Sequence, residues 1–263
     1  MGSATRKALA GTHATLRALG RAELRVAEDV LAAGRVIGSS KQLRTALTNS
    51  EADAAQKRAL VEAVFGSKLT ADAVRLLTDL ASNRWSDSTD LLEGIEDLGF
   101  RVASESAGDA AIDAELFAIE RAVASDSGLE LALGSKLNPT DSKVKIVDRL
   151  LAGKASPQTV AIVNHLVQQP RGRRIGELLR QAATIVAEQR GFQIATVTSA
   201  SPISAAQLDR LVQGLEAQYG RALRVNTIVD PAMLGGVRVQ IGDDVIDGSV
   251  ASRLSSLRQK LAG

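Results

Sequence analysis

Apolar residues recur three and four positions apart along most of the chain, from the N-terminus to about Arg190. Val160, Val163 and Val167 belong to one such run. This spacing places apolar side chains on one face of an α-helix. Stretches rich in Gly, Pro, Ser and Asn separate the runs, each of which is about 10–20 residues long, as in helical bundles. The first 190 residues are therefore predicted to form a bundle of helices.

Polar residues in front of these runs predict where several helices begin. Either Thr140 or Asp141 is expected to cap one helix, and Ser156 followed by Pro157 is expected to start another. The segment Ser204-Ala-Ala-Gln207 has the spacing of a capping box and opens a helix that Gly220 would close.

An internal repeat runs through the helical part. Four segments recur in the same order, each 86 or 87 residues later: 43–47 with 129–133, 56–66 with 143–153, 77–81 with 163–167, and 90–92 with 177–179. Such ordered matches favour a duplicated helical unit. The alternative is that two bundles rich in Ala and Leu resemble each other by composition alone.

The hydrophobic pattern changes at about Gly191 to an alternation with period two. Residues 192–198, 223–229 and 237–241 alternate in this way, and 245–246 follow a tight turn at 242–244, so these segments are predicted to be strands. A final helix is expected after Ser249, with its apolar residues on one stripe. The predicted order is β-α-β-β-β-α. The fold class is therefore mainly α, with a duplicated helical bundle followed by a small C-terminal α+β domain.

Composition narrows the classes of function. Aromatic residues make up 2% of the chain, so the core must consist of Ala, Leu, Val and Ile. The net charge is +2 and both signs are interspersed, whereas a nucleic-acid-binding protein concentrates Lys and Arg on one face. Cysteine is absent and the two histidines, His13 and His165, lie far apart in sequence. Disulfides, thiolate sites and a histidine-based zinc site are therefore not expected.

The sequence contains no apolar run of the roughly 18–20 residues that span a bilayer, and no apolar region follows the first residues as in a signal peptide. We therefore expect a cytoplasmic protein that reaches the membrane only through its partners.

Few residues suggest chemistry of their own. Gly235-Gly236 precedes a strand rather than a helix, so we interpret it as a turn with positive φ and not as a phosphate site. Asp243, Asp244 and Asp247 lack the spacing of a calcium loop, and we interpret them as a hairpin turn and a helix start. No catalytic residue, metal or cofactor is predicted.

Three other features suggest packing or contact with a partner. The basic segment Arg171-Gly-Arg173-Arg174 is either a solvated loop or a contact with an acidic protein. His165 lies among apolar residues and is expected to be a packed histidine rather than a base. Trp85 is expected to pack at a helix end, with an exposed anchor for a partner as the alternative.

Residues 230–254 resemble the signature of the delta subunit of F-type ATP synthases, which mitochondria call the oligomycin-sensitivity-conferring protein. The family pattern has a small residue and Gly before an apolar strand, then Gly-Asp, an apolar pair, Asp-Gly-Ser and a helix with Arg-Leu. The corresponding residues are Gly235, Gly236, Gly242, Asp243, Asp247, Gly248, Ser249, Arg253 and Leu254. The resemblance implies that these residues form a structural or stalk-binding element.

The resemblance also suggests a domain organisation. Residues 91–190 are similar to the family's six-helix bundle, with Arg171, Arg173 and Arg174 where the family often has a short Gly-Arg element, and 191–263 to its α+β stalk-binding domain. Residues 1–90 are additional, and the repeat indicates that they form a second helical unit. The whole chain thus resembles the enlarged delta subunits of actinobacteria, without the membrane helix of the forms fused to a stalk subunit.

The resemblance implies a non-catalytic subunit of the peripheral stalk on the cytoplasmic face of the cell membrane. Its partners would be the N-termini of the alpha subunits in the catalytic head and the b-type stalk subunit. The alternative is a helical adaptor that binds nucleic acid or regulates another protein, favoured only by the Arg-rich character of the chain.

Overall fold

The computed structural model describes residues 2–242 and 244–250. Contacts divide the chain into two compact units, Met1–Val186 and Ala187–Gly263. The first unit is helical, and the second contains the strands. The predicted division of the helical part at residue 90 stays a prediction.

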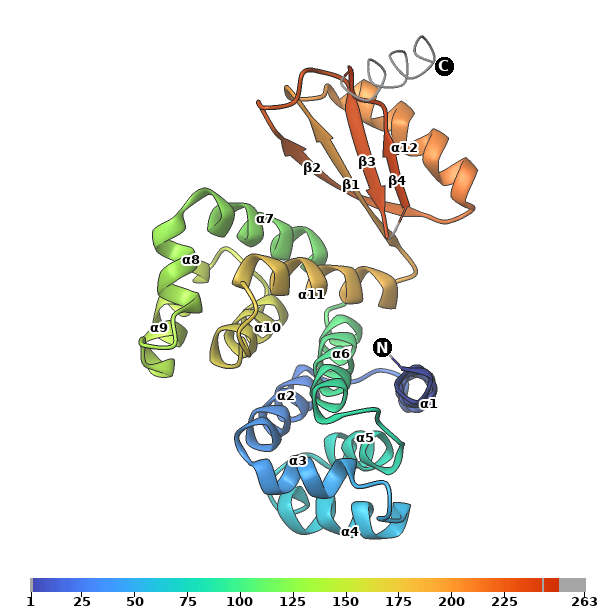
Figure 1. Cartoon of the computed structure of the whole chain (residues 1–263), viewed down its shortest axis with the longest axis vertical. Coiled ribbons are helices and arrows are strands. Elements are labelled where there is room, and N and C mark those ends of the chain that lie inside the picture. Colours follow the sequence, from blue (N-terminus) through green and yellow to red (C-terminus); the bar gives the residue numbers. More distant parts are fainter. Residues whose placement is uncertain (1, 243, 251–263) are drawn as a thin grey trace, which may run out of the picture. The chain divides into compact units, whose positions relative to one another are not determined.

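Eleven helices account for the described part of the chain up to residue 189, which confirms the helical pattern of the sequence (Figure 1). They are α1 (Ser3–Leu19), α2 (Leu24–Ser39), α3 (Lys41–Thr48), α4 (Ala54–Phe65), α5 (Ala71–Ser82), α6 (Ser88–Ser106), α7 (Ile112–Ser125), α8 (Ser127–Gly134), α9 (Thr140–Leu151), α10 (Pro157–Gln168) and α11 (Ile175–Gln189). Across the residues that the structure describes, every helix is too short or too polar to cross a membrane.

The predicted helix starts are partly correct. The Ser156 side chain accepts a hydrogen bond from the Thr159 amide, with Pro157 in the first turn of α10, as expected. The prediction that Thr140 or Asp141 caps α9 is wrong. Pro139 occupies the capping position and Thr140 is already helical, because the fixed φ of proline suits the residue at a helix start. No side chain caps α9.

The repeat predicted from the sequence is present in the helices. In the first set α3, α4 and α5 begin at residues 41, 54 and 71, and in the second set α8, α9 and α10 begin at 127, 140 and 157. Paired helices have equal lengths of 8, 12 and 12 residues. Lys57 and Lys143, which are 86 residues apart, are both buried.

One interhelical hydrogen bond recurs in both sets. The Asp29 carboxylate on α2 accepts from the Thr70 amide just before α5, at 2.7 Å. The Glu115 carboxylate on α7 accepts from the Ser156 amide just before α10, at 2.9 Å. Both members of this pair shift by 86 residues. A carboxylate on α2 thus holds the start of α5, and a carboxylate on α7 holds the start of α10 in the same way, which supports a duplicated unit.

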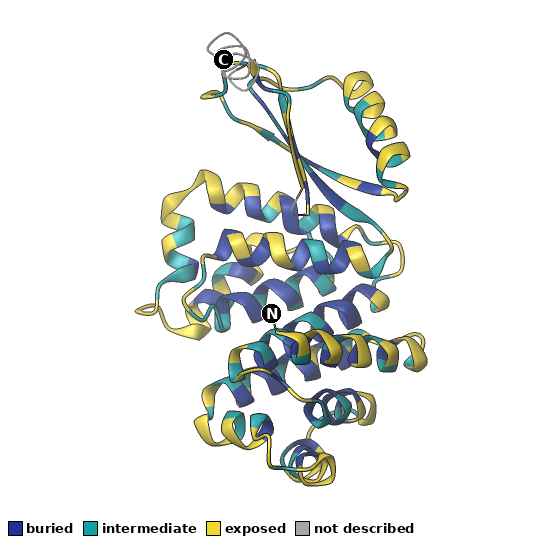
Figure 2. Cartoon of the chain, turned by 45° about the vertical axis from the view of Figure 1, so that its right-hand side comes forward, coloured by how far each residue is buried: buried dark blue, intermediate teal, exposed yellow. Residues whose placement is uncertain are grey.

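With their neighbours the two sets extend from α1 to α6 and from α6 to α11. Helix α6 therefore belongs to both: it is the last helix of the first set and the first helix of the second. Its buried residues surround the whole helix and include Leu91, Leu92, Ile95, Leu98 and Val102. A helix that is buried on nearly all sides lies inside a protein, and Figure 2 shows the buried stripes of the helices around it. Two successive bundles therefore share one central helix.

The second unit contains a four-stranded sheet with the order β2-β1-β3-β4. Its elements are β1 (Gln193–Ser199), α12 (Ala205–Tyr219), β2 (Leu223–Val229), β3 (Val237–Ile241) and β4 (Asp244–Asp247). Strand β1 pairs in parallel with β2, from Gln193 opposite Leu223, and antiparallel with β3. Helix α12 connects β1 to β2 and lies on one face of the sheet (Figure 1).

Local sequence signals explain the ends of α12. Ser204 and Gln207 form the predicted capping box, and Gly220 closes the helix with φ 65°. The unit's core combines Ala195, Val197 and Val239 from the sheet with Leu215 from the helix.

The tight turn between β3 and β4 is shorter than predicted, because Asp244 is already in β4 opposite Ile241. The predicted C-terminal helix lies outside the described residues beyond Val250.

Candidate interaction surfaces

The signature residues surround β3 and β4, where three glycines have left-handed backbone conformations. The φ angles of Gly235, Gly236 and Gly242 are 114°, 86° and 57°. A Cβ atom at Gly236 would lie 2.5 Å from the carbonyl oxygen of Gly248 and 2.8 Å from the Cα of Ser249. Glycine thus allows two backbone segments to approach. The interpretation of Gly235-Gly236 as a turn with positive φ is confirmed.

Asp247 fixes the backbone that follows β4. Its carboxylate accepts from the Ser249 amide at 2.9 Å and lies 3.9 Å from the Arg238 guanidinium. Hydrogen bonds from the side chain and backbone of Ser249, aided by the Arg238 charge, hold the pKa of Asp247 below its usual value. The Gly248 amide donates to the Val237 carbonyl at 2.9 Å.

These contacts gather Gly235, Gly236, Asp247, Gly248 and Ser249 into one corner, with Gly242 at the β3–β4 turn. Asp243, Arg253 and Leu254 lie outside the described residues. Contact of this corner with a stalk subunit stays a prediction.

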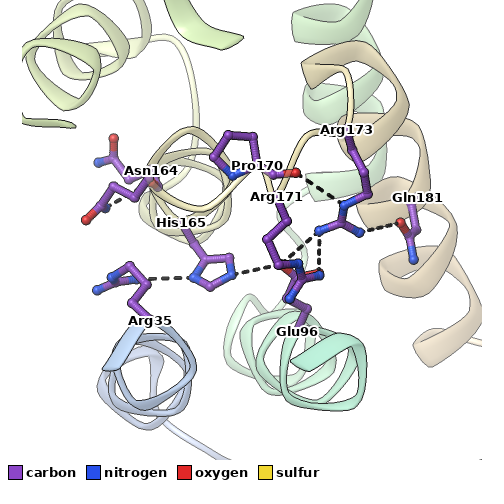
Figure 3. A network of polar contacts seen from close by, with 9 residues as sticks. Arg35, Glu96, Asn164, His165, Pro170, Arg171, Arg173 and Gln181 are labelled. Atoms are coloured by element: carbon purple, nitrogen blue, oxygen red, sulfur yellow. Dashed lines mark hydrogen bonds and ion pairs between the residues drawn. The ribbon is translucent and has the colours of Figure 1, made fainter. Parts of the chain in front are cut away.

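The basic segment after α10 lies against a buried carboxylate on α6. Arg171 donates to one oxygen of Glu96 at 2.6 Å, and Arg173 donates to both oxygens at 3.1 and 2.9 Å (Figure 3). Arg171 has φ 51°, the one positive value among the described non-glycine residues. Arg174 is exposed. Two of the three arginines are thus used inside the helical unit, and a partner contact of this segment stays a prediction.

His165 connects this cluster to α2 of the first set. Its side chain is fully buried, with Nδ1 3.2 Å from the Arg35 guanidinium and Nε2 3.3 Å from Glu96 (Figure 3). Because Arg35 is a donor, Nδ1 must accept, and the Nε2 hydrogen points to Glu96. The expectation of a packed histidine is confirmed. Its partners are 130 and 69 residues away in sequence and were not predicted.

Burial and neighbouring charges set the protonation of this cluster. Burial alone would raise the pKa of Glu96, but the hydrogen bond from His165 and the positive charges of Arg171 and Arg173 lower it below the usual value. Burial, helped by Arg35 and Arg171, lowers the pKa of His165 despite the nearby carboxylate. At neutral pH Glu96 is therefore ionised and His165 is neutral.

The other histidine contacts the same helix from the opposite set. His13 on α1 contacts the carboxylate of Asp97, which also accepts from Arg101 at 2.9 Å. Trp85 is buried, donates to the Leu80 carbonyl at 2.9 Å and packs against Gly94, which confirms that it packs at a helix end.

A groove of about 540 Å³ opens between α7, α8, α9 and α10. Its walls are almost entirely apolar, with Ala114, Ala118 and Ala122 along α7 and Leu129, Leu150 and Leu151 facing them. This groove was not predicted from the sequence. The one feature of the sequence that could have indicated the groove is the row of alanines along α7. Alanine favours any helix, so such a row does not distinguish a packed face from an open one.

Comparison with known proteins gives consistent matches. A sequence model of the family described as "ATP synthase delta (OSCP) subunit" matches residues 99–261. The chain is 54% identical to the ATP synthase subunit delta of Leifsonia xyli over the full length of both chains. It is 39% identical to that of Kineococcus radiotolerans, with 90% of this chain and 87% of the relative covered.

The family match begins inside α6, but the Leifsonia relative covers all residues before it. The first helical set is therefore shared with that relative. A chain in the Toxoplasma gondii mitochondrial ATP synthase hexamer is also similar, with 20% identity and a TM-score of 0.41, over 64% of this chain and 97% of that one.

Proposed function

The chain belongs to the ATP synthase delta (OSCP) subunit family, and from this membership we propose that it is a non-catalytic adaptor of the peripheral stalk. The observation that carries the proposal is the 54% identity to an ATP synthase subunit delta over the entire chain. The adaptor links the catalytic head to the membrane sector on the cytoplasmic face of the cell membrane. It requires no cofactor.

Its task is mechanical. Proton-driven rotation applies torque to the catalytic head through the central shaft, and an unrestrained head would turn with the shaft. The adaptor prevents this by holding the head to a static stalk. The helical unit contacts the N-termini of the head's alpha subunits, and the C-terminal unit contacts the b-type stalk subunit. Several modest contacts on one chain reinforce each other through effective concentration.

The shared helix α6 supports this task. A clamp must keep its shape under load, and packed interiors transmit strain because they are dense and hardly compressible. Glu96 and Asp97, adjacent on α6, each contact a histidine from a different helical set. Residues 1–90, completed by α6, form the additional helical unit and extend the clamp.

The test is affinity purification of the tagged full-length chain from detergent-solubilised membranes, followed by identification of the proteins that co-purify. We expect the alpha and beta subunits of the head and a b-type subunit. An untagged strain is the control for adherent proteins. Recovery of the chain without other ATP synthase subunits would refute the proposal. Binding to DNA or RNA that weakens steeply with salt would instead support the alternative function.

A further inference from the structure

Helix α1 begins the first helical set and buries only one of its faces. Its buried residues recur three and four positions apart and are Thr5, Ala8, Thr12 and Leu16. Helix α6, which begins the second set, is instead buried on nearly all sides. The face of α1 opposite its buried residues is exposed. The helix that begins the first set therefore keeps a free surface that its counterpart in the second set lacks.

The exposed face of α1 consists of three alanines at intervals of four residues and three basic side chains. In chain order its members are Arg6, Lys7, Ala10, Ala14, Arg17 and Ala18. Arg17 lies eleven positions after Arg6, or about 16.5 Å along the helix, which is about three turns. The middle of the face is thus lined by methyl groups, and both of its ends are positive. We call this surface the basic face of α1.

The basic side chains of this segment have no charged partner in the part of the chain that the structure describes. The first 22 residues contain no Asp or Glu and four basic residues, all exposed, which are Arg6, Lys7, Arg17 and Arg21. None of the four forms an ion pair with a described residue. Their charges are therefore available to another molecule.

The carboxylates that neighbouring helices present to α1 are already used by other side chains. Thr15 donates to Asp79 on α5 at 2.9 Å, and Thr5 donates to Asp90 on α6. His13 contacts a further carboxylate on α6. These contacts fix the buried side of α1 and leave its basic face without an internal role.

The stability of α1 itself does not explain its charges either. Acidic side chains stabilise the first turn of a helix, because they lie near the positive end of its dipole. The first turn of α1 has no acidic residue, Gly2 provides no side-chain cap, and the second turn carries Arg6 and Lys7. A segment that departs in this way from the rules of local stability is expected at a functional surface.

We propose that the basic face of α1 binds an acidic helix of another polypeptide, with carboxylates about three turns apart and small side chains between them. Complementary charge selects this occupant and its register. The alanines let the two helix axes approach closely, because the distance between packed helices depends on the side chains at the contact. A lipid surface fits less well, since helices that bind it insert large apolar side chains, which this face lacks.

The proposal rests on the adaptor function and adds a partner contact to it. The family model begins to match at residue 99, so the basic face lies in the part of the chain before that match.

The first test uses the purified full-length chain and a fluorescein-labelled peptide of about 20 residues, long enough to form a helix. Its background is Ala and Gln. One pair of adjacent Glu residues lies eleven positions before a second pair, with Ala between them on the same side. In the control peptide the second pair stands two positions earlier, which turns it to the opposite side of the helix but keeps composition and net charge.

The two peptides should differ in affinity because only the first can engage both ends of the face. Exposed ion pairs contribute little individually, so the ionic strength is kept at about 0.05 M. Fluorescence anisotropy should give a Kd for the first peptide that is at least about fivefold lower than that of the control peptide.

Two double variants of the chain test the location. Arg6→Glu combined with Arg17→Glu reverses both ends of the basic face. Arg58→Glu combined with Lys68→Glu makes the same change in net charge at exposed positions of α4 and the turn after it. The first variant should weaken binding of the first peptide at least about fivefold more than the second does. Both should keep the melting temperature of the unaltered chain, followed by the fluorescence of Trp85.

The second test uses the complex obtained by affinity purification. A carbodiimide joins an amine to a carboxylate that it contacts, with loss of a urea. We expect it to link the amine of Lys7 to an Asp or Glu of another subunit, identified by mass spectrometry of the cross-linked peptides. The other lysines of the chain are the control for reactivity.

Five results would overturn the inference. Equal affinity for the two peptides would show attraction by net charge alone, and the absence of saturable binding up to about 1 mM would show no specific site. Lys7 that links only within its own chain, or stays unlinked while other lysines react, would exclude a partner at this face. A dimer that Arg6→Glu with Arg17→Glu converts to a monomer would identify a second copy as the occupant. Binding to phosphatidylglycerol vesicles at an ionic strength of about 0.15 M that the same variant abolishes would identify a lipid surface.

The affinity purification separates this inference from the proposed function. If the chain co-purifies with the head and stalk subunits but does not prefer the first peptide, the inference fails and the adaptor function stands. If the chain prefers the first peptide and no ATP synthase subunit co-purifies, the adaptor function fails.

Discussion

Replacing Glu96 with Gln keeps the shape of the side chain and removes its negative charge. The carboxylate accepts four hydrogen bonds, one from His165, one from Arg171 and two from Arg173. An amide has one oxygen that accepts and one nitrogen that donates. Whichever way the amide lies, its nitrogen faces an arginine donor, so the variant loses charge and also at least one hydrogen bond.

The magnitude follows from burial. Breaking a buried ion pair by removing one partner costs about 3–5 kcal/mol, because the other charge stays buried without compensation. The side chains of Arg171 and Arg173 keep 17% and 23% of their exposure, so both regain some hydration when the carboxylate is lost. We therefore expect Glu96→Gln to lower the free energy of unfolding by about 3 kcal/mol, the lower end of that range.

Trp85 offers a direct assay of the helical unit. It is the only Trp of the chain and is buried beside α6. Urea unfolding followed by its fluorescence reports the unit that contains Glu96. Glu62→Gln on the exposed face of α4 is the matched control, and it should change stability by less than about 0.5 kcal/mol. A loss below about 1 kcal/mol for Glu96→Gln would refute the reasoning, because it would match a single ordinary hydrogen bond.

Three further predictions concern pH, a glycine and a helix cap. Burial lowers the pKa of His165 in the folded chain, so the unfolded chain takes up this proton first as the pH falls below about 6.5. His165 therefore reduces the free energy of unfolding below that pH by up to about 1.4 kcal/mol per pH unit and has no such effect above it. Urea titrations from pH 7 to 5 should show a shallower decline in the free energy of unfolding for His165→Asn. Gly236→Ala should destabilise the C-terminal unit by about 2–4 kcal/mol, because the strain of a positive φ adds to a clash with the Gly248 carbonyl. Gly214→Ala inside α12 meets open space and should stabilise the unit by up to about 1 kcal/mol. Thermal unfolding should therefore show a lower melting temperature for the first variant and a higher one for the second, and equal melting temperatures would contradict this expectation. Ser156→Ala removes a cap and a hydrogen bond to Glu115, so chemical unfolding should show a loss of about 1–2 kcal/mol, and no loss would mean that water replaces both contacts.

The two candidate surfaces differ in how far their residues reveal them. The corner around Gly236 is local: its glycines, Asp247 and Ser249 lie within 15 positions of one another, and their chemistry indicates turns and a capped segment without knowledge of distant residues. The apolar groove has no such signature. It depends on how α7, α8, α9 and α10 pack against one another, a property that no single segment carries.

Local chemistry was sufficient to establish the kinds of elements and a few of their ends, although it misplaced the start of α9. Period and composition predict helices up to about residue 190, strands after it, the cap at Ser156 and the left-handed turn at Gly220. The offset of 86 or 87 residues between repeated segments predicts the duplication. These signals are readable because capping, turn conformation and amphipathic spacing each involve residues within about one helical turn.

Only the tertiary structure decides how the two helical sets join. Helix α6 completes both sets, and the carboxylates of Glu96 and Asp97 receive histidines from opposite directions in sequence. The sequence predicts that Arg171 and Arg173 belong either to a solvated basic loop or to a contact with an acidic protein, whereas in the structure they lie against Glu96, 75 and 77 residues away. The physical reason is range: an ion pair forms only where folding brings both charges within a few ångströms, and spacing along the chain does not specify which distant charge that is.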